Sequence, residues 1–121
     1  MESKRKTVLI IDDDESITNT FARILGKKGY FTDAAQSGKE ALAKAEAKFY
    51  DVALIDICLP DMNGNELLDK LKKYEKMVKI IITGVPMMAP QNKADAYLVK
   101  PVRPQELIEL IEWKTAEKND K

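Results

Sequence analysis

The apolar run Val8-Leu9-Ile10-Ile11 is followed directly by three acids, Asp12-Asp13-Asp14. A short, branched and uninterrupted apolar run is typical of a strand that is buried on both faces. Adjacent acids at the end of such a strand concentrate negative charge, which costs free energy unless a cation or protons neutralise it. The sequence therefore predicts a buried strand with a metal site at its carboxyl end.

The rest of the chain alternates between strand-like and helix-like segments. Further strands are predicted at 30–35, 51–55, 78–82 and 96–99. Apolar residues at helical spacing follow the first three strands and return after the last strand, at 104–113. Because strands that alternate with helices form parallel sheets, we expect a doubly wound α/β domain.

The segment between the fourth and fifth strands departs from this pattern. Pro86 and Pro90 fall where the interior of a helix would lie. Proline removes a backbone donor and clashes with the preceding helical turn. We therefore predict that the helix between strands 4 and 5 is shortened or absent. The polar tail, at about 115–121, is predicted to be frayed.

Composition narrows the class of protein. A chain of 121 residues is expected to be a single domain, 1–121. Its 20 basic residues balance its 20 acidic ones, so no net field favours direct binding of nucleic acid or an anionic membrane. The sequence has no histidine, which excludes imidazole metal sites, and its single cysteine, Cys58, fits a reducing compartment. No segment approaches membrane-spanning length, and we expect a cytoplasmic protein.

Polar residues follow four of the five predicted strands. They are the acid pair Asp12-Asp13, then Asp56, Thr83 and Lys100. In an open parallel sheet, ligands bind beyond the carboxyl ends of the strands, where the strand order reverses. For a five-stranded sheet in the order 2-1-3-4-5, these four strands are neighbours. We therefore expect all four polar signals to meet at one edge of the sheet.

This ordered set of motifs resembles a response-regulator receiver domain, the phosphoacceptor part of two-component signalling, over essentially the whole chain. The matching features are the acid pair after VLII, Asp56 after VALI with Pro60 and Gly64 downstream, Thr83 after KIII, and Lys100-Pro101 after AYLV. The resemblance implies a flavodoxin-like five-stranded sheet. It also implies a signalling domain that accepts a phosphoryl group and catalyses its own phosphorylation and dephosphorylation, and that is not a turnover enzyme. Because the 121 residues leave no room for an output domain, we expect this domain to stand alone.

The resemblance assigns a phosphoacceptor and a metal. Asp56 would accept the phosphoryl group from a sensor histidine kinase, because a carboxylate can form an acyl phosphate. Mg²⁺, or Mn²⁺ in its place, is a hard cation that prefers oxygen ligands. The implied ligands are Asp12, Asp13, Asp56 and the backbone carbonyl of Cys58.

The resemblance also assigns roles to the residues after strands 4 and 5. Lys100 would place a positive charge beside the acceptor, and its bond to Pro101 would be cis. Thr83 would donate its hydroxyl to the phosphoryl group. Its movement would be coupled to the rotamer of Tyr97 in a two-state switch. A downstream protein or a phosphorelay partner would recognise the switched surface. The domain itself would be a monomer or a weak dimer.

Two other functions stay open at this stage. Asp12 and Asp14 have the two-residue spacing of a haloacid-dehalogenase-like phosphohydrolase, but Glu15-Ser16 does not match what usually follows. Asp14 is better interpreted as a residue that favours the start of a helix. The third function is an unphosphorylated scaffold with the shape of a receiver, which would not need the acid pair, the threonine or the lysine.

Overall fold

The computed structural model describes residues 5–85 and 94–119. Within these residues, five strands form one parallel sheet in the order β2-β1-β3-β4-β5, which confirms the predicted order. The strands are β1 (Thr7–Ile11), β2 (Phe31–Ala35), β3 (Val52–Ile55), β4 (Val78–Thr83) and β5 (Ala96–Val99). The helices are α1 (Glu15–Lys27), α2 (Gly38–Ala47), α3 (Gly64–Leu71) and α4 (Pro104–Asn119).

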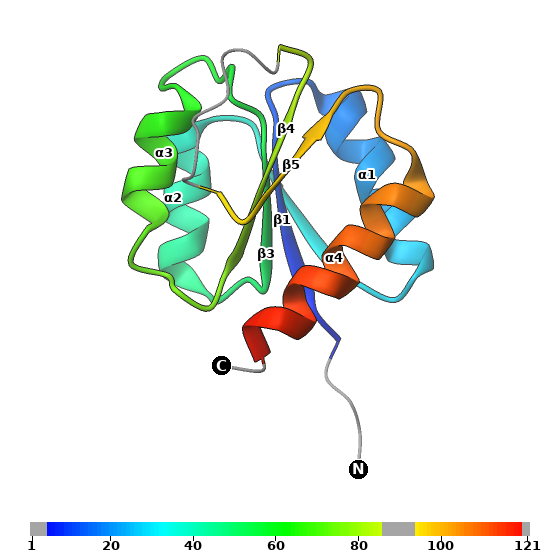
Figure 1. Cartoon of the computed structure of the whole chain (residues 1–121). Helices are drawn as coiled ribbons and strands as arrows, with labels where there is room; N and C mark the ends of the chain where they lie inside the picture. The colour runs from blue at the N-terminus through cyan, green and yellow to red at the C-terminus, as the bar shows by residue number, and fades with distance from the viewer. Residues whose placement is uncertain (1–4, 86–93, 120–121) are drawn as a thin grey trace.

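Helices cover both faces of the sheet. Figure 1 shows α2 and α3 on one face and α1 and α4 on the other. Because successive side chains of a strand point to opposite faces, Leu9 and Ile11 of β1 pack in the core beneath α2 and α3. Val8 and Ile10 pack in the second core, with α1 and α4. This arrangement explains why β1 is apolar at consecutive positions.

Side-chain caps fix the start of three helices. Asp14 accepts the backbone N–H of Ser16 at 2.9 Å, which confirms that it begins α1. Ser37 accepts the N–H of Glu40 at 3.0 Å, and Asn63 accepts the N–H of Glu66 at 2.9 Å. Each cap pairs with a donor that has no partner within its own helix. The loops at the carboxyl ends of β1, β2 and β3 are therefore closely defined.

The final helix is longer than the sequence predicts. Fraying was expected from about residue 115, and this is wrong for 115–119, because α4 continues to Asn119. Thr115 is buried, and its hydroxyl donates to the carbonyl of Ile111 at 2.8 Å. The ammonium of Lys118 reaches the carbonyl of Glu75 at 2.8 Å and the carboxylate of Asp95 at 3.3 Å. These tertiary contacts, which a local reading of polar residues does not include, hold the last turn.

The predicted loss of a helix between β4 and β5 concerns mainly 86–93, which lie outside the described residues. The flanking residues Gly84, Val85, Ala94 and Asp95 belong to no helix. The shortened connection therefore stays a prediction. Among the described helices, none is both long and apolar enough to cross a lipid bilayer.

Candidate metal centre

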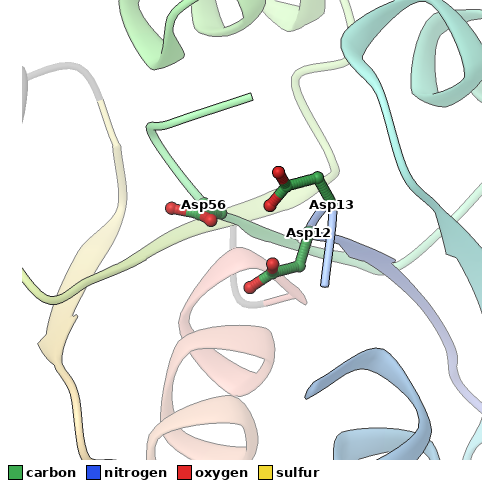
Figure 2. A group of neighbouring side chains, drawn as sticks. All are labelled: Asp12, Asp13 and Asp56. Atoms are coloured by element: carbon green, nitrogen blue, oxygen red, sulfur yellow. The ribbon is translucent and has the colours of Figure 1, made fainter. Parts of the chain in front are cut away.

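Three acids meet where β1 and β3 end. Ile11 is paired with Ile55 across these neighbouring strands, so Asp12 and Asp56 leave the sheet side by side. One carboxylate oxygen from each of Asp12, Asp13 and Asp56 lies within 4.8 Å of the others (Figure 2). The predicted acidic cluster therefore forms.

The donor set suits a hard divalent cation. All three side chains offer oxygen, which Mg²⁺ and Mn²⁺ prefer, and the absence of sulfur and imidazole from the cluster disfavours softer metals. Asp12 is buried and Asp13 is exposed, so the cluster has one solvated side from which an ion can keep water ligands. The backbone N–H of Asp14 donates to Asp12 Oδ1 at 2.9 Å and orients that carboxylate.

Lys100 reaches the cluster from the end of β5. Its ammonium nitrogen lies 3.3 Å from Asp12 Oδ2 and 3.9 Å from Asp56 Oδ2. Its backbone N–H donates to the carbonyl of Thr83 at 2.9 Å, and its peptide bond to Pro101 is cis, as predicted. A single positive charge thus lies between two of the three acids.

Asp56 combines a largely buried carboxylate with two neighbouring acids, Asp12 and Asp13. Only 12% of its side chain is exposed. Burial raises the pKa of Asp56, and the N–H of Cys58, which donates to Oδ1 at 3.2 Å, lowers it. The charges of Asp12 and Asp13 also raise this pKa, while Lys100 lowers it. A bound cation would act in the same direction as Lys100 and favour the ionised form.

Thr83 lies at the same edge of the sheet, at the end of β4. It is buried, and its hydroxyl oxygen accepts the N–H of Val85 at 2.9 Å. Tyr97 lies on β5, two positions before the partner of Thr83 in the strand register, and its hydroxyl accepts the N–H of Ala94 at 3.3 Å. The threonine is therefore where the sequence predicts it. The coupling between Thr83 and Tyr97 stays a prediction.

Asp14 caps α1 and is not part of the three-acid cluster. Its Oδ1 accepts both the N–H and the hydroxyl of Ser16, at 2.9 and 2.7 Å, and these bonds lower the pKa of Asp14. The pair Asp12 and Asp14, which a phosphohydrolase of the haloacid-dehalogenase type would use, is therefore divided between the cluster and a helix cap.

Sequence reasoning missed Asp61, in the loop that follows Asp56. Its two carboxylate oxygens accept the N–H groups of Gly38 and Lys39, each at 2.8 Å. Asp61 lies in a Pro-Asp-Met-Asn-Gly run that reads as ordinary turn chemistry. Its partners lie more than twenty positions earlier in the chain. Nothing local could have predicted this contact.

The fold and the site together define a doubly wound α/β protein with a cluster of acids and one lysine at the carboxyl edge of its sheet. Comparison with known proteins narrows this class. The family model described as the response regulator receiver domain matches residues 8–112. The chain belongs to this family, whose members are the receiver domains of two-component systems.

Individual relatives agree with this assignment. The chain is similar to a CheY-like response regulator receiver domain from Methanospirillum hungatei, with 40% identity, a TM-score of 0.88, and coverage of 97% of this chain and 98% of that one. It is also similar to the response regulator TrrA from Thermotoga maritima, solved in complex with Mg²⁺ and BeF, with 30% identity, a TM-score of 0.81, and coverage of 89% and 97%.

A curated relative is a longer protein. The alkaline phosphatase synthesis transcriptional regulatory protein PhoP of Bacillus subtilis is 32% identical over 108 residues, which cover 84% of this chain and 45% of the relative. The chain spans about half the length of the curated relatives that it matches. Because PhoP is named as a transcriptional regulator, the expectations of a stand-alone domain and of no direct contact with nucleic acid stay predictions.

Proposed function

We propose that this receiver domain accepts a phosphoryl group on Asp56 from a sensor histidine kinase, in a reaction that depends on Mg²⁺. The observation that carries the proposal is the position of Asp56. Its largely buried carboxylate lies beside Asp12 and Asp13 and 3.9 Å from the ammonium of Lys100. A nucleophile with acids and a cation fixed around it is what phosphoryl transfer requires, because that reaction depends on positioning and charge neutralisation.

The residues around Asp56 would have different roles in phosphoryl transfer. Asp12, Asp13, Asp56 and the carbonyl of Cys58 would hold Mg²⁺, which supplies neutralisation of the phosphoryl oxygens when bound. A carboxylate oxygen of Asp56 bonds to phosphorus as the bond from phosphorus to the donor imidazole breaks. Lys100 stabilises the new negative charge. The response regulator TrrA, a relative at 30% identity, was solved in complex with Mg²⁺ and BeF, which supports the proposed role of Mg²⁺.

The output of the domain follows from the added charge. The Thr83 hydroxyl oxygen accepts the N–H of Val85, and the proton of a hydroxyl can be donated in turn, here toward a phosphoryl oxygen. We infer that this bond draws Thr83 inward and changes the position of Tyr97, a residue that is 38% exposed. A downstream protein or a phosphorelay partner would read the changed surface.

Intact mass spectrometry tests the proposal directly. After incubation with acetyl phosphate and Mg²⁺, the wild-type protein should carry one phosphoryl group, and Asp56→Asn should carry none. Asp14→Asn is the matched control, because asparagine also caps helices and the residue lies outside the cluster. A phosphoryl adduct that persists in Asp56→Asn would exclude Asp56 as the acceptor.

The same experiment separates the two other functions. Repeated hydrolysis of acetyl phosphate that survives Asp56→Asn but not Asp12→Asn would indicate a phosphohydrolase. If no phosphoryl adduct forms, with or without Mg²⁺, the protein would be an unphosphorylated scaffold. The capping role of Asp14 and the ion pair of Lys100 with Asp12 favour the phosphoacceptor over both.

A further inference from the structure

The loop that follows the acceptor, residues 57–63, is closed at its base by its own backbone. The N–H of Gly64 donates to the carbonyl of Ile57 at 3.1 Å. Cys58 and Asn63 form an isolated antiparallel β-bridge. Cys58 also donates its N–H to Asp56 Oδ1 at 3.2 Å. The position of this loop therefore influences both the orientation of the acceptor carboxylate and the location of the Cys58 carbonyl.

The tip of the loop is held by a different element, the N-terminus of α2. Asp61 Oδ1 accepts the N–H of Gly38, and Asp61 Oδ2 accepts the N–H of Lys39, each at 2.8 Å. We call this two-bond contact the clasp. The side chain of Met62 lies directly against Gly38, where an added Cβ would come within 2.5 Å of its Cγ and Sδ atoms. The bare backbone of Gly38 thus allows the loop to approach closely.

The clasp is more than a helix cap. Ser37 already caps α2 by accepting the N–H of Glu40, and Glu40 accepts the N–H of Gln36 in return. Asp61 accepts two further N–H groups of the first turn, those of Gly38 and Lys39, and a carboxylate is favoured there by the positive end of the helix dipole. The two bonds lower the pKa of Asp61, so the carboxylate is ionised at neutral pH. The clasp joins the acceptor loop to a helix that is anchored independently.

We propose that Asp61 is a positioning residue of the metal centre, which holds Cys58 beside Asp56 by fastening the acceptor loop to α2. The inference rests on the proposed function for its consequence, since a loosened loop would weaken Mg²⁺ binding through the Cys58 carbonyl. Outer partners of metal ligands commonly contribute about 10-fold or more to metal affinity. The contact itself does not depend on the metal.

Two substitutions of Asp61 and one matched control test the clasp. Asp61→Ala removes both bonds, whereas Asp61→Asn keeps one acceptor oxygen and should give an intermediate effect. Ser37→Ala is the control, because it removes a cap from the same end of α2 and leaves the contact of the loop intact. All three variants are expected to lower thermal stability by a few degrees, so stability alone cannot separate them.

Two measurements then separate the variants. Hydrogen exchange of the amides of residues 57–63, with EDTA present, should be faster in Asp61→Ala than in Ser37→Ala. Calorimetric titration with Mg²⁺ should show affinity about 10-fold weaker in Asp61→Ala, less weakened in Asp61→Asn, and within twofold of wild type in Ser37→Ala.

Equal Mg²⁺ affinity in Asp61→Ala and wild type would overturn the proposal, and so would an equal loss in Ser37→Ala. A wild-type protein that binds no Mg²⁺ would instead refute the metal dependence of the proposed function. In that case, hydrogen exchange of the loop amides decides the role of Asp61 by itself. Exchange in Asp61→Ala that equals that of wild type would refute the claim that Asp61 fastens the loop to α2, and faster exchange would support it.

Discussion

Without a bound cation, the ionised carboxylate of Asp56 is destabilised by burial and by repulsion from neighbouring acids. It is largely buried and lies close to Asp12 and Asp13, with Lys100 as the nearby positive charge. Such an arrangement raises the free energy of the folded state relative to a site without the extra charge. This repulsion would favour cation binding, because a bound cation relieves it.

Because of this repulsion, we expect the stability of the folded protein to depend on pH when EDTA keeps the site free of metal. The pKa of Asp56 is raised in the folded state, so the folded protein binds this proton more tightly than the unfolded chain does. Ionised Asp56 therefore destabilises the fold at neutral pH, and this penalty disappears as the pH falls through the raised pKa. Asp56→Asn should be more stable than wild type at pH 7, and the difference should shrink toward acidic pH.

Thermal unfolding of both proteins across a pH series would measure this difference. Glu66→Gln is the control, because Glu66 is an exposed acid outside the cluster. A wild-type protein that is the more stable of the two at pH 7 in EDTA would contradict the prediction.

Removal of the positive charge of Lys100 should strongly slow the phosphorylation of Asp56. Lys100→Met keeps much of the side-chain volume but removes the charge that lies between Asp12 and Asp56. Loss of one preorganised charge stabiliser typically slows a reaction about 100-fold or more. The rate of adduct formation with acetyl phosphate at saturating Mg²⁺ would report this loss, with Lys114→Met, at a lysine on α4, as the control. A rate within threefold of wild type would show that Lys100 does not stabilise the transferred group.

The sequence predicts the positions of these residues well, and the physical reason is simple. A polar residue directly after a buried parallel strand can lie only at the carboxyl edge of the sheet, so Asp12, Asp56, Thr83 and Lys100 converge once the strand order is set. Asp61 follows no strand, and its partners are fixed by how two loops meet in the folded protein. No pattern of spacing could have revealed it.

At the scale of the elements, Gly64 fixes the junction between the acceptor loop and α3. A Cβ on Gly64 would lie 2.7 Å from Ile57 Cγ2 and 3.1 Å from its backbone Cα, and Ile57 is buried. Gly64→Ala should therefore destabilise the protein by about 1–3 kcal/mol, because backbone must move to relieve the contact.

Gly26 offers the opposite case in α1. A Cβ there would meet nothing within 4 Å, and its backbone is helical. Gly26→Ala should stabilise the protein by about 0.5–1 kcal/mol, since alanine loses less backbone entropy in a helix. Urea denaturation of the two variants measures both effects. Two variants that shift the unfolding midpoint in the same direction would contradict this account.

The boundaries of the elements show where local patterns stop being sufficient. The strand predicted at 96–99 matches β5, and the one predicted at 30–35 differs from β2 by one residue. β5 (AYLV) is an apolar run that ends at Lys100-Pro101, whereas β2 (FTDAA) is less regular and contains Thr32 and Asp33. The end of α4 was misjudged because it depends on Glu75 and Asp95, which lie far from Lys118 in the sequence. Local propensity cannot include such partners.

At the scale of the whole molecule, the metal should act as a ligand of the folded state. The cluster combines residues that follow two different strands, β1 and β3, so the unfolded chain has no comparable site. Mg²⁺ at about 100 times its dissociation constant should raise the free energy of unfolding by roughly 2.7 kcal/mol. Asp13→Asn should lose most of this gain. Urea unfolding in Mg²⁺, compared with NaCl of equal ionic strength, would test it, and equal gains in the two salts would indicate screening alone.

The sheet has one further consequence for the charge that Asp56 would receive. The strands are parallel and each helix runs back beside them, so the N-termini of α1, α2 and α3 lie at the same edge as the acids (Figure 1). Every helix N-terminus carries a partial positive charge. The backbone itself therefore supplies a standing positive potential at that pole, present before any phosphoryl group arrives. Part of the capacity to hold an anion belongs to the topology of the chain and would survive the loss of any single side chain.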